Sequence, residues 1–493
     1  MRNLASMSQR VLLPWILLAL VWALVARIAD TEEIRDLGSG TGSVAFPLDA
    51  GGVHATHTTA GSAETAGSRA PVPEAGDAGF LETMDPAKPA PLAEPPKEEK
   101  PKKWFEKFGL RGYTQFRLNE TMVLLPGSAP AQNPSDKSVG ANQNFLIRRA
   151  RLILSGDISD HMAVYLQPDF AVNVPGSPDA TYFAQLRDWY ADCYLDKEKE
   201  YRFRVGLSKV PYGWENMQSS SNRLPLDRSD ALNSAVRNER DVGVFFYWTP
   251  EYAQEFFKQV IDLGLKGSGN YGVFGFGAYD GQGGSLVEQN ENLHIVARLA
   301  LPMQLPSGQF LEAAIQGYTG KYTVLSSPIS PLGIGPPVRP GGTLETGNPQ
   351  GILDERLAAT LVWYPQPLGF QAEWNVGRGP GLNDAQTAVI DRALEGGYAM
   401  VLYRHLTPCH GTLFPFARYV HYRGGYKPER NAPFSRIDEW ELGLEWQFNP
   451  QMELTCAYTF TDRTNTTAIS KAGEQSYRQF VGQLLRVQFQ VNY

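Results

Sequence analysis

Residues 145–156, FLIRRARLILSG, place three arginines within four positions of an otherwise apolar run. In an extended strand, successive side chains point to opposite faces. Alternation predicts an apolar face that carries Leu146, Ala150, Leu152 and Leu154, with Arg148 near one end. The opposite, mixed face carries Phe145, Ile147, Arg149, Arg151 and Ser155. A buried cation requires a partner, and the segment contains no acidic residue. Such a strand suits a wall between an apolar phase and water.

The same alternation continues from Gly109 to the end of the chain, interrupted by turn residues. It predicts sixteen strands, at 109–118, 145–156, 161–172, 183–195, 201–210, 240–249, 270–279, 292–302, 309–319, 354–364, 369–377, 396–406, 412–423, 435–448, 451–463 and 479–492. An even count and a length of about ten residues match tilted membrane-spanning strands.

The connections between these strands alternate in length. The long ones are 119–144, 211–239, 320–353 and 378–395, and tight ones are 156–159, 196–200 and 449–451. Because the long gaps follow odd-numbered strands, they lie on one rim, as in outer-membrane barrels. The fold class is therefore all-β, a closed antiparallel transmembrane β-barrel of about 16 strands over 105–493, whose closure leaves no strand edge in lipid.

One connection is long on the short-turn side, at 250–269. Within it, 256–267 (FFKQVIDLGLKG) could form an extra strand, which would spoil the even count. We interpret it as a strand extension or an inserted turn.

The N-terminus has the pattern of an export signal. Arg2 and Arg10 precede the apolar run 11–26, so we expect a signal peptide at 1–29, with an uncleaved signal anchor as the alternative. Residues 30–104 are rich in Pro, Ala and Gly, and dense prolines with alternating Lys and Glu favour a disordered periplasmic linker.

Several function classes find no support in the residues. The net charge of −7 gives no reason to expect nucleic acid. We expect Cys193, Cys409 and Cys456 to be unpaired, and His405 and His410 to lie in a turn rather than to bind a metal. We expect no cofactor.

Two enzyme-like patterns are also weak. The G-x-G-x-x-G at 267–272 is followed by YGVFGFGAY, which continues as a strand, whereas a dinucleotide site requires strand, turn and helix. No arrangement of Ser, His and Asp suggests a nucleophile. We therefore expect no enzyme.

Four stretches resemble the phosphate-selective porin O and P family. They are NFLIRRARLILSGDI (144–158), VGLSKVPYGWE (205–215), RNERDVGVFF (237–246) and the aromatic C-terminal strand, and the resemblance extends from about Gly109 to Tyr493. It implies a barrel of 16 strands in the outer membrane of a Gram-negative-type envelope, usually trimeric. It also implies that the loop after the fifth strand, here 211–239, folds inward to narrow the pore. Tyr493 resembles the terminal aromatic residue that the outer-membrane assembly machinery recognises.

The candidate site consists of cations expected to face the lumen. They are Arg111, Arg117, Arg149, Arg151, Arg202, Arg204 and Lys209 on strands, and Arg223, Arg228 and Arg237 in the inward loop. Acidic residues occupy neighbouring positions, namely Asp169, Asp188 and Asp192 on strands, and Glu215, Asp227, Asp230 and Glu239 in the loop. Arg149 and Arg151 therefore have two interpretations, as a selectivity element or as structural ion pairs with Asp169 or Asp188.

These features predict a porin for passive diffusion of small hydrophilic solutes, with anions such as phosphate as candidates. Its partners would be membrane lipid, the assembly machinery, the solute and further copies in a homotrimer. The alternative is an outer-membrane receptor or surface-binding barrel with a largely blocked lumen, because the loop 320–353 is long enough to act as a lid.

Overall fold

A computed structural model describes residues 103–128, 139, 144–173, 182–284, 286–324, 350–384, 388–408, 410–429, 431–466 and 477–493. The expected signal segment 1–29 and nearly all of the expected linker 30–104 lie outside the described residues, as do most of the loops 119–144 and 320–353 and Cys409.

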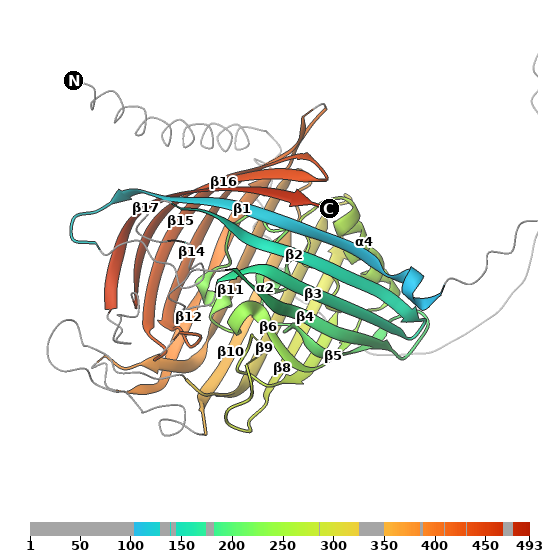
Figure 1. Cartoon of the computed structure of the whole chain (residues 1–493), viewed down its shortest axis with the longest axis horizontal. Coiled ribbons are helices and arrows are strands. Elements are labelled where there is room, and N and C mark those ends of the chain that lie inside the picture. Colours follow the sequence, from blue (N-terminus) through green and yellow to red (C-terminus); the bar gives the residue numbers. More distant parts are fainter. Residues whose placement is uncertain are drawn as a thin grey trace, which may run out of the picture. The chain divides into compact units, whose positions relative to one another are not determined.

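In the ranges that the structure describes, seventeen antiparallel strands form one closed sheet (Figure 1). They are β1 (Gly109–Leu124), β2 (Asn144–Ser159), β3 (Met162–Asn173), β4 (Tyr182–Tyr194), β5 (Tyr201–Lys209), β6 (Arg240–Trp248), β7 (Phe274–Tyr279), β8 (His294–Gln304), β9 (Phe310–Tyr322), β10 (Ile352–Trp363), β11 (Leu368–Leu382), β12 (Val389–Tyr403), β13 (His405–Thr407), β14 (Gly411–Gly425), β15 (Phe434–Asn449), β16 (Met452–Thr466) and β17 (Tyr477–Asn492). Apart from β13, which follows β12 without pairing with it, each strand pairs with its neighbour in the chain, and β1 pairs with β17 to close the ring.

The sheet is a barrel of 16 strands, as the sequence predicts. The short β13 continues β12 beyond Arg404, and both segments pair with the same strand, β14. One predicted loop is wrong: the gap at 378–395 is largely strand, because β11 and β12 remain paired as far as Leu382 and Val389. The hairpin extends because backbone pairing satisfies its donors and acceptors, even where glycines weaken the hydrophobic alternation.

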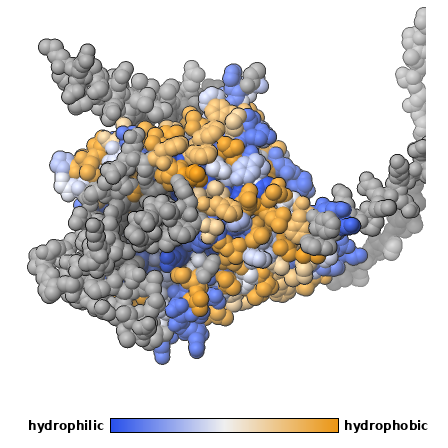
Figure 2. Space-filling model, viewed as in Figure 1, coloured by the Kyte–Doolittle hydropathy of each residue, from blue (hydrophilic) through white to orange (hydrophobic). Residues whose placement is uncertain are grey.

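Side chains alternate between the lumen and the outer wall. On β8, buried His294, Val296 and Arg298 alternate with the outward Ile295 and Leu299, which are largely exposed. Figure 2 shows hydrophobic residues over the barrel wall and hydrophilic residues towards its edges. Such an apolar outer band is what a membrane-spanning barrel presents to lipid.

A bulge in β2 corrects the predicted faces of the arginine-rich segment. Gln115 on β1 pairs with Arg149, but the next residue, Phe116, pairs with Ile147, so Arg148 has no opposite residue. Phe145 is consequently 73% exposed rather than inward, and Arg148 points inward rather than to the apolar face. An extra residue in one strand reverses the parity on one side of it.

Five helical segments accompany the sheet within the described part of the chain. They are η2 (Trp104–Lys107), α2 (Trp214–Met217), α3 (Asp230–Asn233), η3 (Arg237–Glu239) and α4 (Glu251–Asp262). The interpretation of 256–267 as a strand extension or inserted turn is wrong, because α4 covers 251–262. Its buried residues Ala253, Phe256, Phe257 and Val260 have helical spacing. Among the described residues, no helix is both long and apolar enough to span a membrane.

Candidate functional site

The connection between β5 and β6, residues 210–239, folds into the barrel. We call it the constriction loop; nearly all of its residues are buried, and α2 lies inside the ring of strands (Figure 1). Gly213 allows the turn into α2 with φ of 80°, a conformation that glycine adopts readily. Glu373 on β11 accepts hydrogen bonds from the backbone N–H groups of Trp214 and Glu215, at 2.6 and 2.8 Å.

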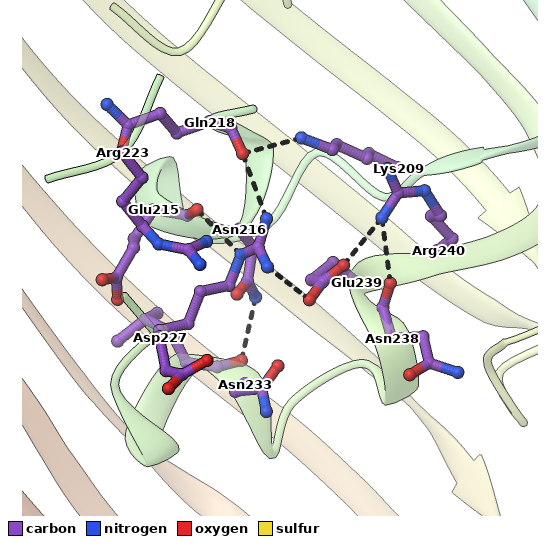
Figure 3. Close-up of polar contacts among 12 residues, drawn as sticks. Lys209, Glu215, Asn216, Gln218, Arg223, Asp227, Asn233, Asn238, Glu239 and Arg240 are labelled. Carbon is purple, nitrogen blue, oxygen red and sulfur yellow. Dashed lines mark hydrogen bonds and ion pairs between the residues drawn. The ribbon is translucent and has the colours of Figure 1, made fainter. Parts of the chain in front are cut away.

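Ion pairs hold the base of the constriction loop to the adjacent strands (Figure 3). Glu239 accepts from Arg228 at 2.6 Å and from Arg240 at 2.7 Å, and Arg240 also contacts Asp188 at 2.9 Å. Lys209 at the end of β5 donates to the carbonyls of Met217 and Gln218, at 2.7 and 2.8 Å. These contacts neutralise Arg228 and make Lys209 an anchor for the loop backbone.

Arginines of the barrel wall reach the loop carboxylates. Asp227 contacts Arg117 at 3.2 Å, Arg148 at 3.8 Å and Arg486 at 2.5 Å. Although burial opposes the charge, Arg117 and Arg486 hold the pKa of Asp227 well below its usual range. This carboxylate therefore ties the loop to three strands, β1, β2 and β17.

Two further loop carboxylates have single anchors on the far wall. Glu215 contacts Arg418 on β14 at 2.5 Å, and Asp230 contacts Arg463 on β16 at 3.1 Å. Burial raises the pKa of Asp230 to about 6, despite the opposing charge of Arg463. The loop thus spans the lumen between opposite parts of the wall.

Several predicted cations belong to ion pairs between strands. Arg151 contacts Asp169 at 2.8 Å, and Asp192 contacts Arg204 at 2.8 Å and Arg202 at 3.6 Å. Arg151 thus has the contact with Asp169 that the structural interpretation expects. The three arginines share two carboxylates, so most of their charge is compensated.

Arg149 and Arg223 differ from most of the other lumen arginines, because within the described ranges neither makes an ion pair. Arg356 also lacks one there, but it donates to Ala231 and Ser234 of the constriction loop. Arg149 is 4% exposed and donates to the side chain of Gln115 at 2.7 Å. Arg223 is 6% exposed and donates to the carbonyls of Pro225 and Leu226, at 2.9 and 3.1 Å. Burial and the charge of Arg228 lower the pKa of Arg223. A buried cation without a counter-charge is unfavourable, so an anion beside it is stabilised.

The two arginines belong to one cluster. Gln115, which accepts from Arg149, donates to the carbonyl of Ser220 in the constriction loop at 3.0 Å. The carbonyl of Leu226 accepts from both Arg223 and Arg117, at 3.1 and 3.0 Å. The Arg149 Nε and one terminal Arg223 nitrogen, Nη1, have no hydrogen-bond partner. Both nitrogens are buried within the protein, so what the cluster offers to a solute is its excess positive charge.

The other predicted residues lie elsewhere. Arg111 is exposed at the short-turn end of β1, where it contacts Ser155 at 3.4 Å, and Arg237 is half-buried in η3. The prediction omits wall arginines that contact the constriction loop, namely Arg148, Arg356, Arg418, Arg463 and Arg486. Their inward parity could have identified all except Arg148, whose position depends on the bulge.

Sequence comparison places this barrel and its inward loop in a known family. The profile of phosphate-selective porin O and P matches residues 129–493, more than half of the chain. The chain belongs to the phosphate-selective porin O and P family. A search of the curated proteins gives no match.

Solved structures give a remote likeness to this porin. OmpT of Vibrio cholerae has a TM-score of 0.46 at 10% identity, covering 78% of this chain and 97% of its own. An anion-selective porin from Comamonas acidovorans has a TM-score of 0.45 at 11% identity, covering 78% of this chain and 99% of its own. Salmonella typhi OmpF in complex with daunomycin has a TM-score of 0.48 at 11% identity, covering 79% of this chain and 98% of its own.

Family membership agrees with the predicted fold, location and general function. The porin is an outer-membrane channel for small solutes. Within the described part of the porin, no group of three or more His, Cys, Asp and Glu side chains is arranged to hold a metal ion.

Proposed function

We propose that this porin prefers small anions, with phosphate among the candidates, and that Arg149 and Arg223 set the preference. The observation that carries the proposal is that these two buried arginines make no ion pair within the described ranges, whereas Arg117, Arg151 and Arg204 contact carboxylates. Arg356 also lacks an ion pair there, but it anchors the constriction loop. Charge that the protein does not neutralise attracts mobile anions.

The hydrogen-bonding capacity of the two guanidinium groups supports the same proposal. An anion that enters a narrow pore loses water, and donors must replace that water. Guanidinium nitrogens form strong, charge-assisted hydrogen bonds to oxyanions. Among the described residues, Arg149 Nε and Arg223 Nη1 are buried donors without partners. They would compensate an oxyanion for its lost hydration once the guanidinium groups turn towards it.

The test compares Arg149→Gln and Arg223→Gln with the parent porin in planar bilayers under a KCl gradient. A hydrogen bond to a charged group contributes about 1.5–3 kcal/mol. Each substitution should therefore raise the half-blocking phosphate concentration about 10- to 100-fold and shift the reversal potential away from chloride selectivity. Arg378→Gln is the matched control, because Arg378 pairs with Asp391 on the outer surface and is largely exposed.

The outcomes separate the candidate functions. Unchanged selectivity and block in both variants would reject the two arginines as the anion site. A parent protein that conducts no ions would instead support the alternative of a receptor with a blocked lumen.

Two partner assignments also belong to this proposal. The family resemblance favours a homotrimer. Tyr493 exchanges backbone hydrogen bonds with Gly112 at 2.5 and 2.9 Å, while its side chain remains 56% exposed. That exposure is compatible with recognition by the assembly machinery.

The absence of enzymatic activity also stays a prediction.

A further inference from the structure

The helix α4 lies at the short-turn end of the barrel, between β6 and β7 (Figure 1). Its buried face contacts the wall: the ring of Phe256 lies 5.2 Å from that of Phe310 on β9 and 6.1 Å from that of Tyr364. Tyr364 in turn contacts Trp214 of the constriction loop, at 6.5 Å between rings. These residues form one apolar cluster, in which Tyr364 connects α4 to the constriction loop.

The chain after α4 crosses the lumen. The Lys266 side chain forms an ion pair with Glu445 on β15 and lies 5.1 Å from the centre of the Phe414 ring on β14. β14 and β15 stand opposite β5 and β6 in the ring of strands. The chain then returns, and the carbonyl of Asn270 accepts from Arg202 on β5 at 2.7 Å. Residues 263–270 therefore span the pore from one wall to the other.

This crossing segment is fastened to the constriction loop as well. Gln218 donates to the carbonyl of Lys266 at 2.6 Å, and Asn222 donates to the carbonyl of Gly267 at 2.8 Å. The side chains of Lys266 and Glu445 are 1% and 2% exposed. Both charges are removed from solvent, so each depends on the other for compensation.

The backbone of the crossing segment is held in an unfavourable conformation. Gly264 and Gly269 have φ of 65° and 100°, which glycine adopts readily, but Lys266 also has φ of 66°. The left-handed region is disfavoured for residues with a Cβ atom. The ion pair and the two carbonyl contacts hold Lys266 there, and loss of them would allow the segment to relax.

We propose that residues 251–270 form a plug that narrows the pore at its short-turn end, and that the Lys266–Glu445 ion pair is the latch that keeps the plug closed. Release of the latch frees the crossing segment from β15 and widens the pore. The inference depends on the channel activity of the family but not on the preference for anions. It also gives a structural role to the glycines of 267–272, which serve a turn across the lumen instead of a nucleotide site.

The experiment measures single-channel conductance of the full-length protein in planar bilayers. About 1 M KCl is used, where the screening length is about 3 Å and charge selectivity contributes little. Lys266→Ala and Glu445→Gln should each raise the conductance about twofold, because a wider cross-section conducts more. The charge-reversed double variant, Lys266→Glu with Glu445→Lys, should return conductance towards the parent value.

Lys258→Ala is the matched control. Lys258 lies on α4 and pairs with Asp262 at 2.7 Å, but both side chains are largely exposed, so its removal changes the charge by the same amount without releasing the plug. If Lys266 merely attracted anions, its removal would lower conductance rather than raise it.

Hydrogen exchange is a second measurement, which tests release of the plug even in variants whose overall stability has changed. Hydrogen exchange of 251–270 in the folded variants should become faster while the strand amides remain protected. Unchanged or lower conductance in folded Lys266→Ala and Glu445→Gln would overturn the latch. Loss of anion preference in the Arg149 and Arg223 variants, with the latch result intact, would leave this inference standing.

Discussion

Asp227 is the most consequential single anchor of the constriction loop. It is 7% exposed and contacts Arg117, Arg148 and Arg486. The isosteric substitution Asp227→Asn removes the charge but not the volume. Removal of one partner from a buried ion pair costs about 3–5 kcal/mol, because the opposite charge stays buried without compensation.

The structure favours the lower end of that range. After the substitution, Arg117 keeps its hydrogen bonds to Gln488, at 2.7 and 3.1 Å, and to the Leu226 carbonyl. Arg486 keeps an ion pair with Glu441 at 3.3 Å. We therefore expect a loss of about 3 kcal/mol, which is roughly a hundredfold change in the equilibrium between the docked and undocked loop.

Hydrogen exchange of residues 211–239 measures this change directly, since local opening sets the exchange rate of buried amides. The barrel strands should exchange as in the parent protein, because their ladder hydrogen bonds do not involve Asp227. Asp262→Asn is the control, since exposed ion pairs contribute about 0–1 kcal/mol. If loop protection in Asp227→Asn matched the control, the anchoring argument would be refuted.

Two other predictions concern the loop and the wall. Because the pKa of Asp230 is raised to about 6 in the folded protein from about 3.9 when unfolded, the folded state binds more protons between these values. Docking of the loop should therefore strengthen as pH falls from about 7 towards 5, and Asp230→Asn should abolish this dependence in exchange measurements at several pH values. Leu299→Arg introduces a charge at an outward position that is 47% exposed and should destabilise the barrel by about 2–4 kcal/mol in denaturant titrations in lipid vesicles. A loss no larger than that of Leu299→Ala would argue against a lipid-facing position.

The barrel follows from local properties of the chain. Period-two alternation marks each strand, and the alternation of short and long connections places the long loops on one rim, except for 250–269. Both signals depend only on residues that are close in the sequence, so every predicted strand has a counterpart among β1–β17. The predicted strand 396–406 corresponds to β12 together with its continuation β13. The helix α4 was missed because its apolar residues are adjacent as well as helically spaced, which a short strand also allows.

The charges of the lumen depend on the tertiary structure. Alternation places Arg149 and Arg151 on one face of the strand. It does not predict that Asp169 pairs with Arg151, or that Arg149 donates to Gln115 instead. The bulge at Arg148 is a pairing mismatch between two strands and has no signature in either one.

Strand periodicity and connection lengths are local, so the sequence predicts a closed membrane barrel with a surplus of lumen cations, and the family resemblance adds the inward loop. Which of these cations pair with carboxylates, and that residues 263–270 cross the pore to Glu445, becomes visible only in the folded barrel. The physical reason is that ion pairing depends on distances of a few ångströms between residues far apart in the chain, and these distances exist only once the ring has closed.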